Sequence, residues 1–260
     1  MKNEIILQAS KISIGYTSKK HNTVIASDID LSLKKGKLIS LIGANGIGKS
    51  TLLRTITGIQ KTISGTVLLN QVNIHELDAL TLAKNLSVVL TEKLPPSNLT
   101  VFELIALGRQ PYTNWIGKLT AEDITKVNEA MELTQITHLA DKKHFEISDG
   151  QLQKVLIARA LAQDTPLIIL DEPTTHLDLL HKVSLFKLLK KLTKETDKCI
   201  LFSTHDIDMA IQLSDEMIIM TPKTVIQDEP CNFIAKGSFS RLFNDEHIVF
   251  DPEKGKFIIV

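Results

Sequence analysis

Cysteine is scarce in this sequence of 260 residues. The two that occur are Cys199, within an apolar run, and Cys231, in a predicted loop. Two cysteines so far apart exclude the disulfide framework of small secreted proteins and predict reduced thiols in a cytosolic protein. Neither has the spacing of a metal-ligand pair, so we expect no metal site at the cysteines.

Long apolar runs and an excess of charge of one sign are also missing. No run approaches the roughly 18 to 20 residues of a membrane-spanning helix, and residues 1–10 lack the apolar core of a signal peptide. Thirty lysines and arginines balance thirty aspartates and glutamates. A balanced chain has no overall field that attracts nucleic acid or an anionic membrane. We therefore expect no nucleic-acid partner, and a membrane role only through another protein.

A glycine-rich stretch, GANGIGKS at residues 43–50, is the strongest signal in the chain. Its glycines bracket four free positions before Lys49 and Ser50, and it lies between the apolar run 38–42 and helix-forming residues, as a phosphate-binding loop requires. Backbone N–H groups would surround phosphate oxygens, Lys49 would reach the β- and γ-phosphates, and the Ser50 hydroxyl would coordinate Mg²⁺. An ordinary glycine-rich turn is the alternative. The predicted nucleotide-binding residues are Gly43, Asn45, Gly46, Gly48, Lys49, Ser50 and Thr51.

Alternation of apolar and polar residues predicts an antiparallel layer before this loop. Strands are expected at residues 5–14 and around Ile29, Leu31 and Leu33. After the loop, short apolar segments alternate with helical ones, which predicts a parallel sheet covered by helices on both faces. The expected strands are residues 66–69, 86–90, 167–170, 200–203 and 217–220, and the later helices are residues 183–192 and 206–213.

Strand patterns vanish between residues 91 and 165, where capped helices appear. Thr100 and Glu103 have capping-box spacing and start a helix to Gly108, and a longer helix follows Thr120. The inner face of the longer helix is predicted to hold Ile124, Val127, Ala130, Met131 and Leu133. We expect one α/β domain over 1–260, with its core at 1–90 and 166–230 and an inserted helical subdomain at 91–165. An extension at 231–260 is expected to carry a short helix at 238–243 and a hairpin of residues 248–250 and 256–260.

Two carboxylates, Asp171 and Glu172, follow the apolar strand 167–170. In a phosphate-loop fold we expect this strand to lie beside the strand of the loop, which would bring both side chains to the phosphates. Asp171 would order Mg²⁺ through water, and Glu172 would orient and polarise the attacking water as the general base. Without the phosphate loop, two solvated acids at a strand end would be the better interpretation.

The stretch ISDGQ at residues 147–151 begins a further helix, and its capping-box spacing by itself indicates only a good helix start. Together with the loop at 43–50, LIILDEPTTHLD at 167–178 and STHD at 203–206, it resembles the ATPase subunit of ABC transporters. The resemblance covers residues 5–220, and four motifs in this order and spacing are highly specific. It implies the P-loop NTPase fold of that family with a mixed or parallel sheet, ATP hydrolysis, and ATP and Mg²⁺ as ligands.

In that family two subunits pair head to tail, and each ATP lies between the phosphate loop of one and the signature helix of the other. The resemblance implies that the start of the signature helix binds the ATP of the partner copy, and that the loop of Asp178 crosses between subunits. His205 matches the histidine that contacts the γ-phosphate. Tyr16 matches the aromatic residue that stacks on adenine, with packing at a strand end as the alternative. The implied nucleotide-binding residues outside the loop are Tyr16, Ser148, Gly150, Gln151 and Asp178, and the implied catalytic residues are Lys49, Glu172 and His205.

The chain departs from the family at two positions. Asp149 stands where the signature usually has glycine, and a carboxylate beside a triphosphate site predicts weaker closure of the dimer. The strand 86–90 should run into a glutamine that touches Mg²⁺, but Thr91 and Glu92 follow it. The implied metal residues are therefore Ser50, Asp171 and Thr91, with Glu92 as the alternative to Thr91.

The stretch GRQPY at residues 108–112 resembles the GR-x-P segment of importers for iron-siderophore complexes, haem and cobalamin, although a helix stop and a proline turn would give the same letters. The implied function is ATP-driven closure of a homodimer that moves integral membrane permease subunits, with an extracytoplasmic substrate-binding protein as an indirect partner. The implied location is peripheral, at the cytoplasmic face of the bacterial inner membrane. Trp115 and Ile116 are candidates for an apolar contact with a membrane subunit, and a core position is the alternative for Trp115.

Other functions remain open at this point. The chain could serve another transporter branch, because the cargo is not encoded in the ATP site. A soluble ABC ATPase acting on DNA or ribosomes usually carries a long coiled coil or a second ATPase domain, and the sequence predicts neither. A non-hydrolysing regulatory module is disfavoured, because Lys49, Asp171, Glu172 and His205 are all present. The terminal hairpin is expected either to extend the sheet or to add to the dimer contact.

Overall fold

The computed structural model describes residues 4–17, 22–90, 97–175, 177–241, 248–252 and 254–259. Its centre is a sheet with the strand order β10-β9-β3-β8-β7-β6, in which all neighbours are parallel except the edge pair β10 and β9. The predicted parallel sheet is confirmed. The strands are β3 (Leu38–Ile42), β6 (Leu86–Val89), β7 (Leu167–Leu170), β8 (Cys199–Ser203), β9 (Glu216–Met220) and β10 (Val225–Asp228), and the helices beside them are α1 (Lys49–Ile56), α6 (Leu179–Thr196) and α7 (Ile207–Leu213).

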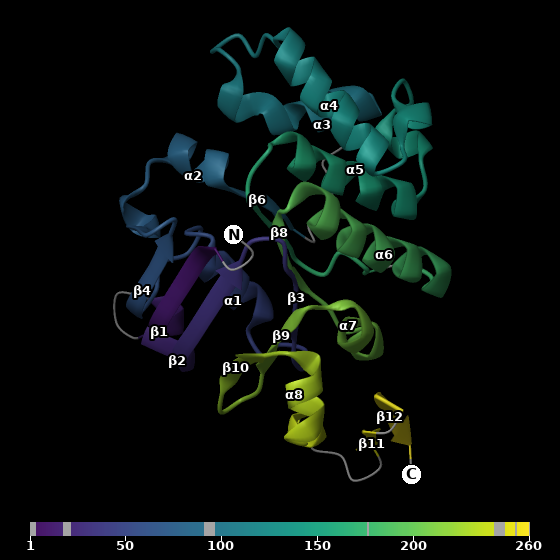
Figure 1. Cartoon of the computed structure of the whole chain (residues 1–260). Coiled ribbons are helices and arrows are strands. Elements are labelled where there is room, and N and C mark those ends of the chain that lie inside the picture. The colour runs from purple at the N-terminus through teal and green to yellow at the C-terminus, as the bar shows by residue number, and fades with distance from the viewer. Residues whose placement is uncertain are drawn as a thin grey trace.

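Side chains of the central strands alternate between two apolar layers. Leu167 and Ile169 of β7 belong to a cluster with α1 and the antiparallel strands, whereas Ile168 and Leu170 belong to a cluster with α6. Burial on both faces explains why these strands read as continuous apolar runs rather than as alternating ones. The sheet thus separates α1 from α6, as Figure 1 shows on the two sides of β3.

The prediction that β7 lies beside β3 was wrong. β8 lies between them and pairs in parallel with both. β8 is buried at every position, which suits a central strand, and nothing in an apolar run specifies its neighbour. Because all three strands are parallel, their carboxyl ends still meet at one edge of the sheet. The phosphate loop, Asp171 and Glu172, and His205 follow these three ends.

The predicted antiparallel layer is a second sheet with the order β2-β1-β4-β5. In β2 the alternation is confirmed, since Ile29, Leu31 and Leu33 are buried and Asp30 is exposed. Its inner face packs in the same cluster as α1, so this sheet covers the side of α1 that the central sheet leaves free. The strands are β1 (Ile5–Thr17), β2 (Asn22–Lys34), β4 (Ser64–Leu69) and β5 (Val72–Asn73).

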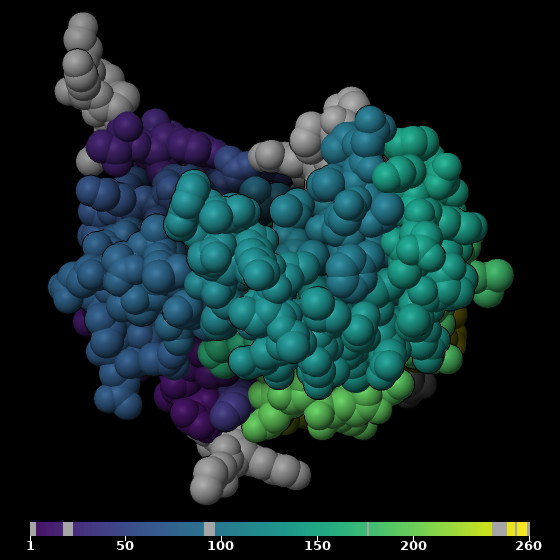
Figure 2. All heavy atoms as spheres, turned by 90° about the horizontal axis from the view of Figure 1, so that it is seen from above, coloured from purple at the N-terminus to yellow at the C-terminus, as the bar shows by residue number. Residues whose placement is uncertain are grey.

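Helices form the upper part of the molecule in Figure 1 and most of the face seen from above in Figure 2. Three of them begin with complete capping boxes, at Thr100, Thr120 and Ser148, which satisfy the first free N–H groups of each helix. The predicted inner face of α4 is corrected at Ile124, which is 42% exposed. These elements are α3 (Val101–Ala106), the 3₁₀ helix η2 (Leu107–Tyr112), α4 (Ala121–Leu133), η3 (Thr137–Leu139), η4 (His144–Glu146) and α5 (Asp149–Ala162).

The C-terminal residues form a small unit on the outer side of α7. The predicted hairpin is confirmed as a separate two-stranded sheet, so within the described residues it does not extend the central sheet. Phe233, Phe239, Phe250 and Phe257 pack together and against α7, which anchors it. The short helix predicted at 238–243 is described to Arg241. The elements are α8 (Pro230–Ala235), η5 (Ser238–Arg241), β11 (Ile248–Asp251) and β12 (Lys256–Ile259).

Most elements that the sequence did not predict are short. The helix predicted from Thr100 to Gly108 is α-helical only to Ala106. It continues as the 3₁₀ helix η2, because Pro111 cannot donate a helical hydrogen bond. Cys231 lies in α8, not in a loop. Among the described residues, no helix has both the length and the apolar character needed to cross a bilayer. The short elements η1 (Ile74–Glu76) and α2 (Ala79–Asn85) were not predicted either.

Candidate nucleotide-binding and hydrolysis site

The loop after β3 turns through two glycines in the left-handed region before α1 begins. Gly46 has a φ of 74° and Gly48 a φ of 111°. A Cβ at Gly48 would also lie 2.5 Å from Cγ2 of Ile25, so no other residue fits there. Helix α1 has no side-chain cap and no acidic residue in its first turn. Its first N–H groups and its dipole are therefore available to an anion.

Lys49 is held inside this loop. Its side chain is only 5% exposed, and Nζ donates to the carbonyl oxygens of Gly43 at 3.1 Å and Ala44 at 3.4 Å. Burial lowers the pKa of Lys49, and the negative charges of Glu172 and Asp171 oppose that shift. A phosphate group that enters the loop would replace the neutral carbonyl acceptors of Lys49 with anionic oxygens. A desolvated ammonium group favours anionic acceptors.

Ser203, at the end of β8, connects the two carboxylates that follow β7. Its hydroxyl accepts from the backbone N–H of Glu172 at 2.8 Å and donates to Oδ1 of Asp171 at 2.7 Å. Glu172 has a φ of 49°, a strained value for a residue other than glycine. The hydrogen bond from its N–H to Ser203 holds this conformation at the end of β7. Ser203 belongs to the STHD motif, but the motif assigns it no role, because its contacts depend on the pairing of β7 with β8.

The Glu172 carboxylate contacts the two other predicted catalytic side chains, Lys49 and His205. Oε1 lies 2.6 Å from Nε2 of His205 and 3.8 Å from Nζ of Lys49. Oε2 accepts from the Thr175 hydroxyl at 3.3 Å. The structure therefore brings Lys49, Glu172 and His205 together, with Glu172 in the middle. A carboxylate between a histidine and the phosphate loop can hold a water molecule and take a proton from it.

Tyr16 lies at the end of β1, next to the start of α1. Its hydroxyl is 3.2 Å from Oγ1 of Thr51, while 58% of its surface is exposed. The ring thus offers an open aromatic face beside the phosphate loop, where a nucleobase could stack. Thr51 is itself buried, and its role in nucleotide binding stays a prediction.

Mg²⁺ fits the donor set at this site. Ser50 is exposed at the start of α1, and Asp171 supplies a carboxylate at the carboxyl end of β7. Mg²⁺ usually takes one or two such ligands and completes its shell with phosphates and water. Thr91 and Glu92, the alternative further ligands, lie outside the described residues.

The other predicted nucleotide-binding residues form a second cluster at the starts of α5 and α6. Ser148 and Gln151 close the capping box of α5, and the Asp178 carboxylate caps α6. These contacts are local to the two helix starts, and α5 belongs to the upper helical group while α1 lies lower among the strands (Figure 1). Among the described residues, no hydrogen bond or ion pair joins the side chains of this cluster to the phosphate loop. Asp149 is exposed at the start of α5, and its predicted effect stays a prediction.

A hydrogen-bonded set that the sequence analysis missed braces the segment after β7 against the segment after β8. The Asp206 carboxylate accepts from Oγ1 of Thr174 and from Nζ of Lys182, both at 2.8 Å. Asp206 directly follows His205, and Thr174 comes two residues after Glu172. Asp206 is part of the STHD motif, but the motif does not predict its partners Thr174 and Lys182.

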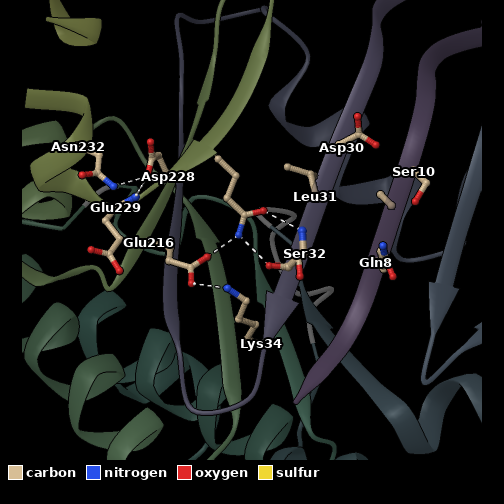
Figure 3. Close-up of a pocket in the computed structure, with 12 residues that line it drawn as sticks. Gln8, Ser10, Asp30, Leu31, Ser32, Lys34, Glu216, Asp228, Glu229 and Asn232 are labelled. Carbon is tan, nitrogen blue, oxygen red and sulfur yellow. Dashed lines mark hydrogen bonds and ion pairs between the residues drawn. The ribbon is translucent and has the colours of Figure 1, made fainter. Parts of the chain in front are cut away.

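Figure 3 shows a separate polar cleft of about 460 Å³ between β2 and the β10–α8 segment. Gln227 bridges it, exchanging two hydrogen bonds of 2.8 Å with the Ser32 backbone and donating to Glu216. Lys34 lies 3.5 Å from Glu216. These contacts join the antiparallel sheet to the edge of the central sheet, and the cleft does not include the phosphate loop.

Residues 26–175 match the family model described as ABC transporter. The chain belongs to the ABC transporter ATPase family. It is 38% identical over 252 residues to the iron(3+)-hydroxamate import ATP-binding protein of Bacillus subtilis, covering 96% of this chain and 92% of that protein. It is 36% identical to the achromobactin transport ATP-binding protein of Dickeya dadantii, covering 95% and 91%. A bacterial ABC transporter cassette solved as a dimer has a TM-score of 0.73 at 27% identity, covering 86% of this chain and 98% of that chain.

The family assignment confirms the fold class and the resemblance predicted from the four motifs. This ABC ATPase binds and hydrolyses ATP.

Proposed function

We propose that this ABC ATPase powers import of an iron-siderophore, haem or cobalamin-type cargo through separate membrane subunits. The observation that carries the proposal is the extent of its similarity to ATP-binding subunits of iron(3+)-hydroxamate and achromobactin transport, which spans nearly the whole chain. The GRQPY segment of η2 supports the same branch.

The proposed chemistry assigns one role to each group of the site. The N–H groups of the loop and Lys49 bind the phosphates, and Tyr16 stacks on adenine. Mg²⁺, held by Ser50 and Asp171, would neutralise phosphate charge. Glu172 accepts a proton from the attacking water, and His205 keeps the Glu172 carboxylate and that water in place.

We propose that ATP joins two copies of the chain. The cluster of Ser148, Gly150 and Asp178 lies apart from the phosphate loop of its own chain, and a head-to-tail pair would let it complete the site of a second copy. The start of a helix binds an anion well, which suits a γ-phosphate. The dimeric cassette with the same fold supports this arrangement. Binding of the γ-phosphate by both copies would then drive closure.

The contact with a membrane subunit is proposed at the loop between η2 and α4. Trp115 is 94% exposed and Ile116 is 68% exposed, so a core position for Trp115 is excluded. Oδ1 of Asn114 accepts from the N–H groups of Ile116 and Lys118 and gives this loop a defined shape. The loop belongs to the helical face in Figure 2. Exposed apolar side chains on an ordered loop favour a protein contact, and the proposed location is peripheral, at the cytoplasmic face of the membrane.

Uptake measurements test the proposed cargo class. In a strain from which this chain and other carriers for these cargoes have been deleted, uptake of a radiolabelled ferric siderophore, haem and cobalamin is compared before and after the chain and its membrane subunits are restored. We expect uptake of one of the three to return with the wild-type chain and not with Glu172→Gln. Uptake of an amino acid by an unrelated carrier is the control. Failure to restore any of the three would contradict the importer proposal and leave the ATPase assignment intact.

Trp115→Ser is expected to lower uptake at least about tenfold, because an exposed tryptophan at a protein contact commonly carries a large share of the binding energy. ATP hydrolysis by the isolated chain should stay unchanged, since Trp115 lies outside the phosphate loop. Val72→Ser, which removes an exposed apolar side chain from β5, is the matched control and should change neither quantity. Equal uptake by the Trp115 and Val72 variants would place the membrane contact elsewhere.

A further inference from the structure

His181, in the first turn of α6, makes two contacts with one carboxylate oxygen. Its backbone N–H donates to Oδ1 of Asp178 at 2.9 Å, and Nδ1 of its ring lies 2.8 Å from the same oxygen. The backbone hydrogen bond and then the ring hydrogen bond hold the pKa of Asp178 below its usual range. Since a carboxylate only accepts, Nδ1 carries the proton, and the ring is fixed in one orientation.

The same ring lies against the start of α5. A Cβ built on Gly150 would lie 2.8 Å from Cδ2 of His181 and 3.3 Å from Cγ. No residue with a side chain fits at position 150 while the His181 ring keeps its place. Gly150 does not have a positive φ, so the limit there is the ring and not the backbone conformation.

Neither contact serves the hydrolysis site within this chain. His181 is not in the group formed by Lys49, Glu172 and His205, and its side chain is 54% exposed. Its side chain does, however, touch both helix starts of the second cluster, Gly150 of α5 and Asp178 of α6. These helix starts come from distant parts of the chain, and a site shared between two copies needs them at one fixed separation.

We propose that His181 is a positioning residue that sets Gly150 and Asp178 at the separation required for closure of the ATP-bound dimer. The proposal rests on the proposed dimer. The Asp178 hydrogen bond holds the ring, and the ring holds the start of α5. A second copy that docks on this surface meets a preformed arrangement, so less conformational freedom is lost on association.

A double-mutant cycle tests the contact in the Glu172→Gln background, where ATP is not consumed. The dissociation constant of the dimer is measured by sedimentation in the presence of Mg²⁺ and ATP. His181→Ala is expected to raise it about tenfold, which corresponds to about 1.4 kcal/mol. Gly150→Ala should raise it by a similar factor with His181 present, because the new methyl group displaces the ring. With His181→Ala already in place, Gly150→Ala should have less than about a twofold further effect, since contacting residues are not additive.

Two further variants separate positioning from general destabilisation. His181→Asn keeps a donor for Asp178 without the ring and should restore part of the lost affinity. Ser184→Ala, at an exposed position on the same helix, is the matched control. Binding of ATP to the dilute monomer should be equal in the His181 and Ser184 variants, because the phosphate loop is untouched.

The outcomes of the cycle are distinguishable. If Glu172→Gln alone forms no ATP-dependent dimer, the proposed two-copy mechanism fails. If it forms a dimer that His181→Ala does not weaken, or if the His181 and Gly150 effects simply add, the positioning role of His181 is overturned while the proposed function stands.

Discussion

Glu172→Gln is expected to lower kcat for ATP hydrolysis by about 10²–10⁴-fold, the usual contribution of a positioned general base. The amide keeps the size of the carboxylate and can still contact Nε2 of His205, so the geometry of the group should survive. What is lost is the ability to accept a proton from water. Steady-state phosphate release at saturating ATP measures the effect.

Binding of ATP should survive the same substitution. The groups proposed to hold the phosphates are the loop N–H groups and Lys49, and removal of a nearby negative charge favours a triphosphate. The affinity for ATP should therefore be equal or higher. Glu195→Gln removes an exposed carboxylate from α6, where it lies 3.7 Å from Lys191, and is the matched control that should leave kcat unchanged. A Glu172 variant that retains more than about a tenth of wild-type kcat would mean that another group accepts the proton.

The phosphate loop and the carboxylates could be predicted because their chemistry is local in sequence. Gly48 and Lys49 act through backbone turns and a helix start within a few residues, and Asp171 and Glu172 follow their strand directly. The capping boxes were equally local, since the side chain at Thr100, Thr120 or Ser148 reaches only three residues ahead. For such features the spacing of residue types in the sequence is enough to predict the local contacts.

The contacts that link distant segments could not be predicted. Ser203 joins Asp171 to Glu172 only because β8 lies beside β7, and the strand order follows from packing on both faces of the sheet. The same holds for the ring of His181 against Gly150. The sequence also assigned Trp115 to either the core or the surface, because an isolated tryptophan in a loop has no periodicity that would decide. Long-range packing settled each of these points.

Arg109 is another residue whose importance appears only in the fold, although the sequence drew attention to the segment that contains it. Its side chain is 4% exposed; Nε donates to Oδ1 of Asp123, and Nη1 donates to the carbonyl oxygen of Ala162, both at 2.8 Å. Its guanidinium also lies 3.9 Å from the centre of the Tyr112 ring. One side chain thus ties η2 to α4 and to the end of α5.

The backbone next to Arg109 shows how closely these elements approach. A Cβ at Gly108 would lie 2.2 Å from the carbonyl oxygen of Arg159, so η2 touches α5 directly. Hydrogen bonds from Thr120, and then from Arg109, hold the pKa of Asp123 below its usual range. Asp123 is therefore charged at neutral pH and needs its buried partner.

Arg109→Met is expected to destabilise the chain by about 3–5 kcal/mol, the usual effect of removing one partner of a buried ion pair. The methionine fills much of the space but leaves the Asp123 carboxylate without its cation and the Ala162 carbonyl without its donor. The melting temperature should fall by about 6–20 °C for a chain of this size. Lys118→Met, in the exposed loop before α4, is the matched control and should shift it by less than about 2 °C. Equal melting temperatures for both variants would show that the stability of the helical part does not depend on the ion pair. The packing of η2 against α5 would then be what stabilises the position of η2.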